Sequence, residues 1–388
     1  MASGQFTYRV AGNFGCHQAH DGGWQVSGIA VGQDALKSPA DDACRGMKGH
    51  DEKVTRRFAA ALVLVFLAPF VGELLLGNTP VRLIFAYLLV LPMYGFGALF
   101  IRELSRRTGR GWPTILILGV AYSVVEEGLA DMSLFNPNFM GQHLLAYGNL
   151  FGIGWPWWFF VLTLHAVWSI GVSIALAEAL FTSTGPNPWL SRKGLVVSAV
   201  GFGFGAVLIH FVGGQGYQLL AGQAALSRLL VAALVTVAFL IPPQRGVQAP
   251  DSHQAPNPWV VGGMAFVLTS AFMVITRLAD PLQLPAAVLI LVYLMLYGLA
   301  VFAVWRWSRR IGWNAEHRFG LAAGALLTYA WYGFVQAPHD MLDVIGQAVF
   351  ALVALGILIL AGRQLRTDKP TPDVPNSLPN AALSRAGT

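Results

Sequence analysis

Long apolar runs separated by short polar connections limit the fold of this sequence more than any other feature. Of its 388 residues, 55% are hydrophobic and only 11% are charged, which is too few charges to cover a water-facing surface of this size. Runs of about 20 apolar residues are long enough to cross the hydrocarbon core of a bilayer as helices. Membrane-spanning strands would instead need segments of about ten residues with alternating polarity, and none occurs. We therefore predict an all-α, polytopic transmembrane helical bundle.

The apolar runs predict about ten spans. The sixth run is short, and we expect its helix to extend back through Ala224. The predicted spans are Phe58–Leu76, Leu83–Ile101, Thr114–Ala130, Trp155–Phe181, Leu195–Val212, Leu229–Ile241, Val260–Thr276, Ala286–Trp305, Phe319–Val335 and Val344–Ala361.

These spans divide the chain into three parts. Residues 58–361 form the transmembrane helical domain. Residues 1–57 form a polar N-terminal extension, which we expect to be disordered to about residue 46 or to reflect a start codon assigned too early, because Met47 opens the segment that leads into the first span. Residues 362–388 are rich in proline and polar side chains, and we expect them to form a disordered cytoplasmic tail.

The basic residues predict how the bundle is oriented. With the N-terminus in the cytoplasm, 19 of the 25 Lys and Arg residues lie in cytoplasmic segments and only 3 in external ones. Such a bias is typical of membrane proteins, and it predicts an even number of spans with both termini inside. The formal net charge of +6 therefore reflects membrane orientation, and we expect the lipid bilayer as a partner and no nucleic acid. We expect the cell membrane, a bacterial plasma membrane, as the location.

Ionisable residues inside the apolar runs are the first candidates for a functional site, because a charge at the bilayer centre costs at least about 2.5 kcal/mol. Glu73 lies in the first predicted span, Glu126 and Glu127 in the third, His165 in the fourth and His210 in the fifth. The predicted orientation puts all of them in the outer half of the membrane. We expect the acids and imidazoles to meet in one buried pocket there.

Such a set of side chains has three interpretations. Two histidines with one or two glutamates can hold Zn²⁺ and leave one position for water. In that case His165, His210 and Glu127 are the metal ligands, and Glu126 or Glu127 is the general base. The same groups could instead relay protons or ions in a transporter of small molecules. In the third interpretation they are interhelical hydrogen bonds of a non-catalytic scaffold.

At these residues the sequence resembles the CPBP family of intramembrane metalloproteases, the CAAX prenyl protease and bacteriocin-processing group. That family carries a Glu-Glu pair on one span and single histidines on two later spans, and Glu126, Glu127, His165 and His210 stand in that order. The resemblance implies a metal-dependent peptidase in which a glutamate activates water and the histidines polarise it or bind metal. Its substrate would be a peptide; a transporter would carry a small molecule.

The sequence departs from the family pattern in several places. Asp131 stands where the family has an arginine after the Glu-Glu pair, Val161 replaces the phenylalanine before the first histidine, and Gly214 replaces the Asn or Asp after the second. The predicted orientation also puts the cluster on the outer side, whereas the family's prenyl proteases work from the cytosolic side. The chain is similar as well to uncharacterised bacterial multi-pass proteins with Glu-Glu-Gly and Phe-Asn-Pro segments, which add no function.

The longest external connection, from Asp131 to Gly154, has two interpretations. It precedes an aromatic cluster that begins at Trp155. This cluster could fold the connection back over the outer mouth of the bundle as a lid, or it could be an ordinary belt of aromatic residues at the membrane interface.

Overall fold

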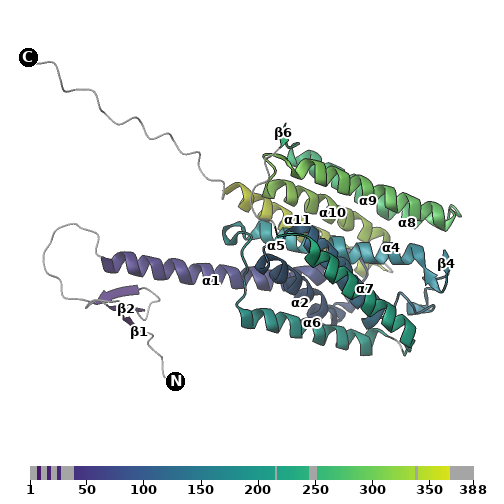
Figure 1. Cartoon of the computed structure of the whole chain (residues 1–388), viewed down its shortest axis with the longest axis horizontal. Coiled ribbons are helices and arrows are strands. Elements are labelled where there is room, and N and C mark those ends of the chain that lie inside the picture. The colour runs from purple at the N-terminus through teal and green to yellow at the C-terminus, as the bar shows by residue number, and fades with distance from the viewer. Residues whose placement is uncertain are drawn as a thin grey trace, which may run out of the picture.

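The computed structural model describes residues 7–9, 15–18, 24–27, 39–214, 216–243, 251–336 and 340–367. Over these residues the chain is an all-α polytopic bundle whose long helices run side by side, as Figure 1 shows. The helices are α1 (Pro39–Pro69), α2 (Ala86–Arg107), α3 (Trp112–Val125), α4 (Trp155–Leu164), α5 (Ser173–Leu180), α6 (Arg192–Gly213), α7 (Ala221–Leu240), α8 (Pro258–Ala279), α9 (Ala286–Ser308), α10 (Ala315–Gln336) and α11 (Met341–Thr367).

Nine helical segments in the described part of the chain are long and apolar enough to cross a membrane. They match nine of the ten predicted spans, and α7 begins at Ala221, so the predicted extension of the sixth span through Ala224 is confirmed. The remaining predicted span, Phe319–Val335, corresponds to α10, which has 22 residues but does not reach the hydropathy of the others. This helix packs against α5, α8 and α11. These helices cover much of its surface, so it can carry more small and polar residues.

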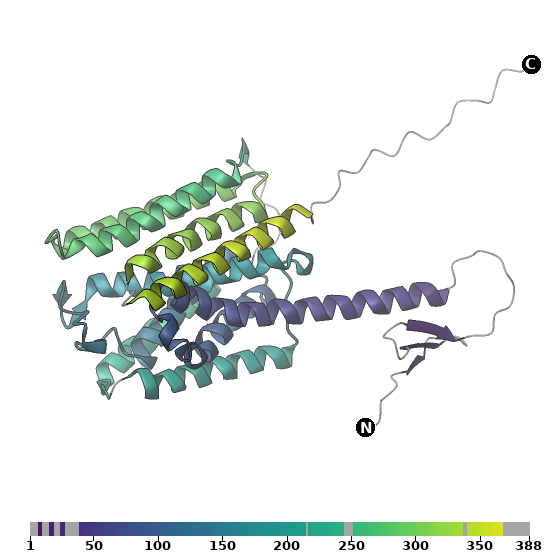
Figure 2. The same ribbon diagram turned by 180° about the vertical axis from the view of Figure 1, so that it is seen from behind.

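Both ends of the bundle domain lie on the same side of the molecule. Figures 1 and 2 show α1 entering the bundle, and α11 leaving it, at one end of the helix axes, while the hairpin of β4 (Asn149–Leu150) and β5 (Ile153–Gly154) lies at the other end. The end where α1 enters also carries the short parallel pair of β6 (Asp251–Gln254) and β7 (Arg310–Ile311). This arrangement agrees with an even number of crossings.

The two ends of the chain are described only in part. Three short antiparallel strands, β1 (Thr7–Arg9), β2 (Gly15–Gln18) and β3 (Trp24–Ser27), precede α1. Helix α1 begins at Pro39, before the predicted start of the first span, and α11 continues to Thr367. The rest of the predicted disordered extension and tail lies outside the described residues, so both expectations stay predictions.

Glycines allow the closest helix contacts, as expected in a bilayer, where helices associate by packing rather than by the hydrophobic effect. On α10, a Cβ atom at Gly324 would collide with the backbone of α8 at Gly262 and Phe266. On α6, a Cβ atom at Gly205 would collide with the backbone of Met93 on α2. The pairs α8–α10 and α2–α6 therefore approach backbone to backbone.

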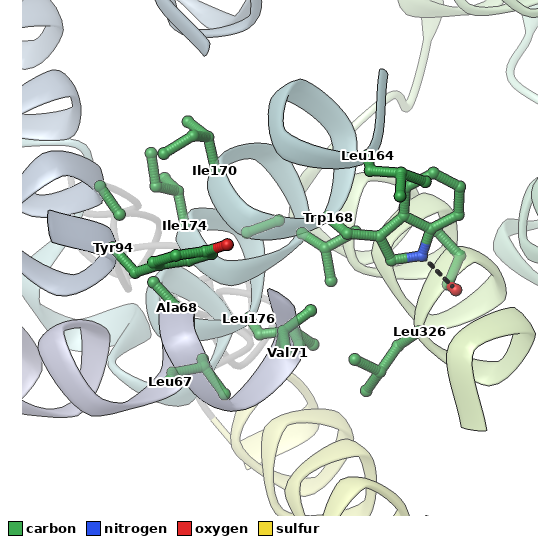
Figure 3. Packing of buried hydrophobic residues seen from close by; sticks show 14 of the residues in the cluster. Leu67, Ala68, Val71, Tyr94, Leu164, Trp168, Ile170, Ile174, Leu176 and Leu326 are labelled. Atoms are coloured by element: carbon green, nitrogen blue, oxygen red, sulfur yellow. Dashed lines mark hydrogen bonds between the residues drawn. The ribbon is translucent and has the colours of Figure 1, made fainter. Parts of the chain in front are cut away.

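The core is formed around the helix that continues from α4 into α5. Figure 3 shows Trp168 reaching from this helix towards α10, where its indole Nε1 donates a hydrogen bond of 2.8 Å to the carbonyl oxygen of Ala325. The Trp168 ring also stacks on Tyr329 with the ring centroids 4.4 Å apart. On the other side of the helix, Tyr94 of α2 lies beside Ile174 and Ala68. This central helix thereby connects the two halves of the bundle.

Candidate functional site

Three helices of the bundle widen into π-helical turns, and these turns carry the buried ionisable residues. Glu73 lies in the π-helical segment Phe70–Leu75, Glu126 and Glu127 lie in Glu126–Ala130, and His165 begins His165–Val172. In the first two segments a five-residue spacing is visible in the backbone hydrogen bonds, from Asn78 to Glu73 and from Asp131 to Glu126. π-Helical turns are rare and occur often at functional sites.

The imidazole of His165 lies between the carboxylates of Glu126 and Glu127. Its Nε2 atom is 2.6 Å from Oε1 of Glu127, and its Nδ1 atom is 3.1 Å from Oε2 of Glu126. All three residues are less than 10% exposed. The structure therefore brings together three of the four residues that the sequence assigned as general base or metal ligands. We call Glu126, Glu127 and His165 the acid–imidazole cluster.

Hydroxyl groups extend this cluster on both sides of the imidazole. Ser133 donates a hydrogen bond to Oε2 of Glu127 and accepts one of 3.2 Å from the indole Nε1 of Trp157. Ser169 lies one helical turn after His165, with its Oγ atom 3.3 Å from Nδ1. Ser133 belongs to the connection Asp131–Gly154, so the start of this connection contacts the cluster through Glu127.

Aromatic rings close the cluster towards α2 and α3. The centroids of the Tyr94 and Tyr122 rings lie 5.7 and 6.1 Å from that of His165. The hydroxyl group of Tyr94 donates to Glu73, which also accepts a hydrogen bond of 3.0 Å from Thr79. Tyr94 thus lies between Glu73 and the imidazole, and the polar groups of the three π-helical segments form one buried region.

An ion pair holds the connection that follows Glu73 to the start of α11. Arg82 donates to Asp343 and lies 3.2 Å from Asp340. The hydrogen bond to Asp343 raises the pKa of Arg82 above its ordinary value, so this group stays charged at any physiological pH.

The buried carboxylates of this region have no lysine or arginine partner among the described residues. The ion pairs of Glu126 and Glu127 there are only those to His165, and Glu73 accepts from Tyr94, Asn78 and Thr79. A single imidazole cannot neutralise three carboxylates. Since an unpaired buried charge is costly, the remaining negative charge must be balanced by protons or by a bound cation.

The acid–imidazole cluster has the composition and spacing of a metal site. One atom from each of Glu126, Glu127 and His165 can be chosen so that all three lie within 4.8 Å of one another. Carboxylate oxygens and an imidazole nitrogen suit several divalent ions, among them Zn²⁺ and Mn²⁺. Among the buried side-chain atoms of the described residues, Oε2 of Glu126 is one of the few without a hydrogen bond of acceptable geometry, and it faces Nδ1 of His165.

The geometry also sets a limit on how one ion could bind. The two carboxylates contact opposite nitrogens of the same ring, so one ion cannot replace both contacts. An ion at Nδ1 would use His165 and Glu126, and Glu127 would then hold the Nε2–H group in place. Carboxylates that orient a metal-bound histidine in this way are common in metalloproteins.

His210 lies next to this region without joining the cluster. Its side chain on α6 is exposed, and its Nδ1 atom is 3.0 Å from the backbone oxygen of Leu129, inside the π-helical segment Glu126–Ala130. It does not belong to the group of potential metal ligands found in the described part of the chain. The assignment of His210 as a ligand stays a prediction.

Tyr94, Tyr122 and Ser133 complete the site, and the sequence pointed to none of them. Tyrosines and serines are frequent in transmembrane helices and loops, and nothing in their spacing relates them to His165. Glu73 was recognisable as an acid inside an apolar run, and the sequence already grouped it with the other acids.

Comparisons with known proteins place the chain in a family without assigning a reaction. No curated protein and no solved structure matches it. Residues 62–367 match a family model that is described as an uncharacterized membrane protein family. The match runs from within α1 to the end of α11 and includes the acid–imidazole cluster, and no match to the CPBP family is found. The chain therefore belongs to this uncharacterized family of membrane proteins.

Proposed function

We propose that this integral membrane protein is a metal-dependent hydrolase of the peptidase class, with Glu126, Glu127 and His165 as its reaction centre. The observation that carries the proposal is the excess of buried carboxylates around one imidazole, with no lysine or arginine of the described residues to balance them. A divalent cation would supply the missing positive charge. The order of the Glu-Glu pair and the first histidine, which resembles that of the CPBP proteases, supports the same chemistry.

Each residue of the centre has a distinct task in this proposal. Glu127 holds the imidazole through Nε2, and Ser133 fixes Glu127 in turn. Nδ1 of His165 and Oε2 of Glu126 face the same space, where a metal ion would supply charge to polarise a water molecule or a carbonyl oxygen. With Oε2 on the ion side, Oε1 of Glu126 would take the proton of the attacking water as the bond to the carbonyl carbon forms. It returns that proton to the amine as the C–N bond breaks.

A proton relay is the second candidate, and a different observation favours it. Both ring nitrogens of His165 lie within hydrogen-bonding distance of a carboxylate. Ser133 donates to Glu127, so polar side chains follow one another from the connection Asp131–Gly154 through Glu127 to His165. Such chains of acids and histidines move protons in transporters. A relay needs protons rather than a metal ion to balance the carboxylates.

Two assays in proteoliposomes, peptide cleavage and proton flux, distinguish the hydrolase from the relay. Wild-type protein is incubated with a mixture of hydrophobic membrane-protein peptides, and new amino termini are counted by mass spectrometry. For a hydrolase, we expect Glu126→Gln and His165→Gln to lower the rate at least about 100-fold, since a general base contributes that much. His317→Gln is the matched control, because His317 is also buried in the bundle but bonds to the carbonyl oxygen of Pro256.

A pH-sensitive dye inside the same vesicles measures proton flux under a pH gradient. New termini that depend on Glu126 and His165, and that a chelator abolishes, support the hydrolase. Flux that depends on Glu127 and His165 but resists chelation, without new termini, refutes the hydrolase and supports the relay. If neither activity exceeds that of empty vesicles, both proposals fail and the scaffold interpretation remains.

A further inference from the structure

A second buried ionic cluster lies at the end of α2 that leads into the cytoplasmic segment predicted from the charge distribution. Arg102, Glu103, Arg106 and Arg107 stand on this end of the helix, and Glu178 of α5 packs against it. Arg318, near the start of α10, interacts electrostatically with Glu178 and Arg106. We call these six residues the arginine cluster; it has four cations and two anions.

Both carboxylates of the arginine cluster are already fully engaged. Glu178 accepts hydrogen bonds from Nε and Nη2 of Arg106 at 2.9 and 2.7 Å and from Nε of Arg102 at 3.2 Å. Glu103 accepts from Nη1 of Arg102 at 2.5 Å and from the backbone N–H groups of Trp189 and Leu190 at 2.9 and 3.0 Å. Each oxygen of both acids therefore already accepts at least one hydrogen bond.

Three side-chain donors at the same end of α2 have no hydrogen-bond acceptor among the described residues. Nη2 of Arg102, Nε of Arg107 and Oγ of Ser105 are buried and have no hydrogen-bond partner among the described residues. The Arg102 side chain is 0% exposed, and its guanidinium carbon lies 3.4 Å from the centroid of the Trp189 ring. A buried guanidinium with an unused N–H group is costly unless an acceptor reaches it.

The arginine cluster is open enough at its rim for such an acceptor to approach. The side chains of Arg107 and Glu178 are 22% and 16% exposed, whereas Arg102 and Glu103 are closed off behind them. An excess of two positive charges, together with unused donors of planar guanidinium groups, matches a tetrahedral oxyanion. Arginine is the residue that most often binds phosphate in proteins through paired N–H groups.

We propose that the arginine cluster binds a phosphate group at the cytoplasmic end of α2, either the headgroup phosphate of an anionic phospholipid or free phosphate. Arg107 and Arg318 form the rim, and Arg102 forms the floor. The ligand neutralises the excess charge and accepts hydrogen bonds from the unused guanidinium donors. This site is separate from the acid–imidazole cluster and does not depend on the proposed reaction.

Binding of two probes tests the proposal on the full-length protein. Equilibrium dialysis with inorganic phosphate measures binding of the free anion. Native mass spectrometry, after exchange into vesicles of equal phosphatidylcholine and phosphatidylglycerol, measures which lipid stays bound. We expect Arg107→Gln and Arg318→Gln each to weaken binding about tenfold, the usual effect of losing one charge-assisted contact. Arg192→Gln is the matched control, because Arg192 is an exposed cation at the start of α6.

The two probes identify the source of the phosphate group. Phosphate binding that the two rim variants weaken supports the site with a free anion as ligand. Retention of phosphatidylglycerol over phosphatidylcholine by at least about tenfold, again weakened by the rim variants, supports a lipid headgroup. If a rim variant is not monodisperse, the wild-type measurements decide alone. The proposal is overturned if the wild type binds neither probe selectively, or if the rim variants bind as the control does.

Discussion

At the scale of single residues, the acid–imidazole cluster depends on how the partners of one histidine are arranged. His165 has a carboxylate on each nitrogen, and Ser133 fixes the closer carboxylate. His210 bonds instead to a backbone oxygen and is exposed. Both histidines occur in apolar runs, so their positions in the sequence could not show that only one is enclosed.

The substitution His210→Gln separates the two histidines. We expect metal affinity to stay within about twofold of the wild type, because the side chain is outside the cluster and glutamine can keep a hydrogen bond to Leu129. The substitution His165→Gln should lower the affinity at least about tenfold. Titration with a fluorescent zinc competitor measures both. A loss at His210 as large as that at His165 would show that His210 is a ligand after all.

At the scale of helices, small residues decide which neighbours come close. Gly324 on α10 leaves no room for a methyl group, because the nearest atoms belong to the backbone of α8. Gly263 on α8 has nothing within 4 Å of an added Cβ atom. The α8–α10 pair therefore needs glycine at one position and tolerates a larger residue at the other.

Alanine substitutions test this contact. We expect Gly324→Ala to destabilise the protein by about 1–3 kcal/mol, since backbone atoms cannot move aside as a flexible side chain can. The matched control Gly263→Ala should change stability by no more than about 0.5 kcal/mol. Unfolding of both variants in detergent, followed by circular dichroism, measures the difference. Equal stability of the two variants would contradict the close packing of α8 on α10.

Part of this element structure was predictable from the sequence and part was not. The membrane-spanning segments were predictable, because apolar runs long enough to cross a bilayer can form few structures other than transmembrane helices. The π-helical turns at Glu73, Glu126 and His165 were not predictable. An extra residue in a helical turn shifts the backbone and side chains, and only the neighbouring helices determine whether there is room for that shift. Tertiary contacts therefore decided the position of each acid, while hydrophobicity decided its span.

At the scale of the whole molecule, the charge distribution and the architecture agree. The end where α1 enters and α11 leaves is the end that the Lys and Arg count assigns to the cytoplasm. The β4–β5 hairpin at the opposite end then faces the outside. This orientation puts the acid–imidazole cluster nearer the outer surface and the arginine cluster nearer the cytoplasm.

Labelling of single cysteines in intact cells tests the orientation, in a background that carries Cys16→Ser and Cys44→Ser. We expect Asn149→Cys, in the exposed hairpin, to react with a membrane-impermeant maleimide in intact cells. Ser308→Cys, at the exposed end of α9, should react only after the membrane is permeabilised. The reverse labelling pattern would mean that the bundle has the opposite orientation. Labelling of both positions in intact cells would contradict the odd number of crossings that the predicted spans place between Asn149 and Ser308.

The central claim is that a divalent metal ion, rather than protons alone, balances the buried carboxylates of Glu126 and Glu127 beside His165. Inductively coupled plasma mass spectrometry of the purified full-length protein tests it directly. We predict about one divalent ion per chain in the wild type, strongly reduced in His165→Gln and Glu126→Gln but retained in His317→Gln. A wild type that holds no more metal than His165→Gln, both before and after incubation with Zn²⁺ or Mn²⁺, would contradict the claim.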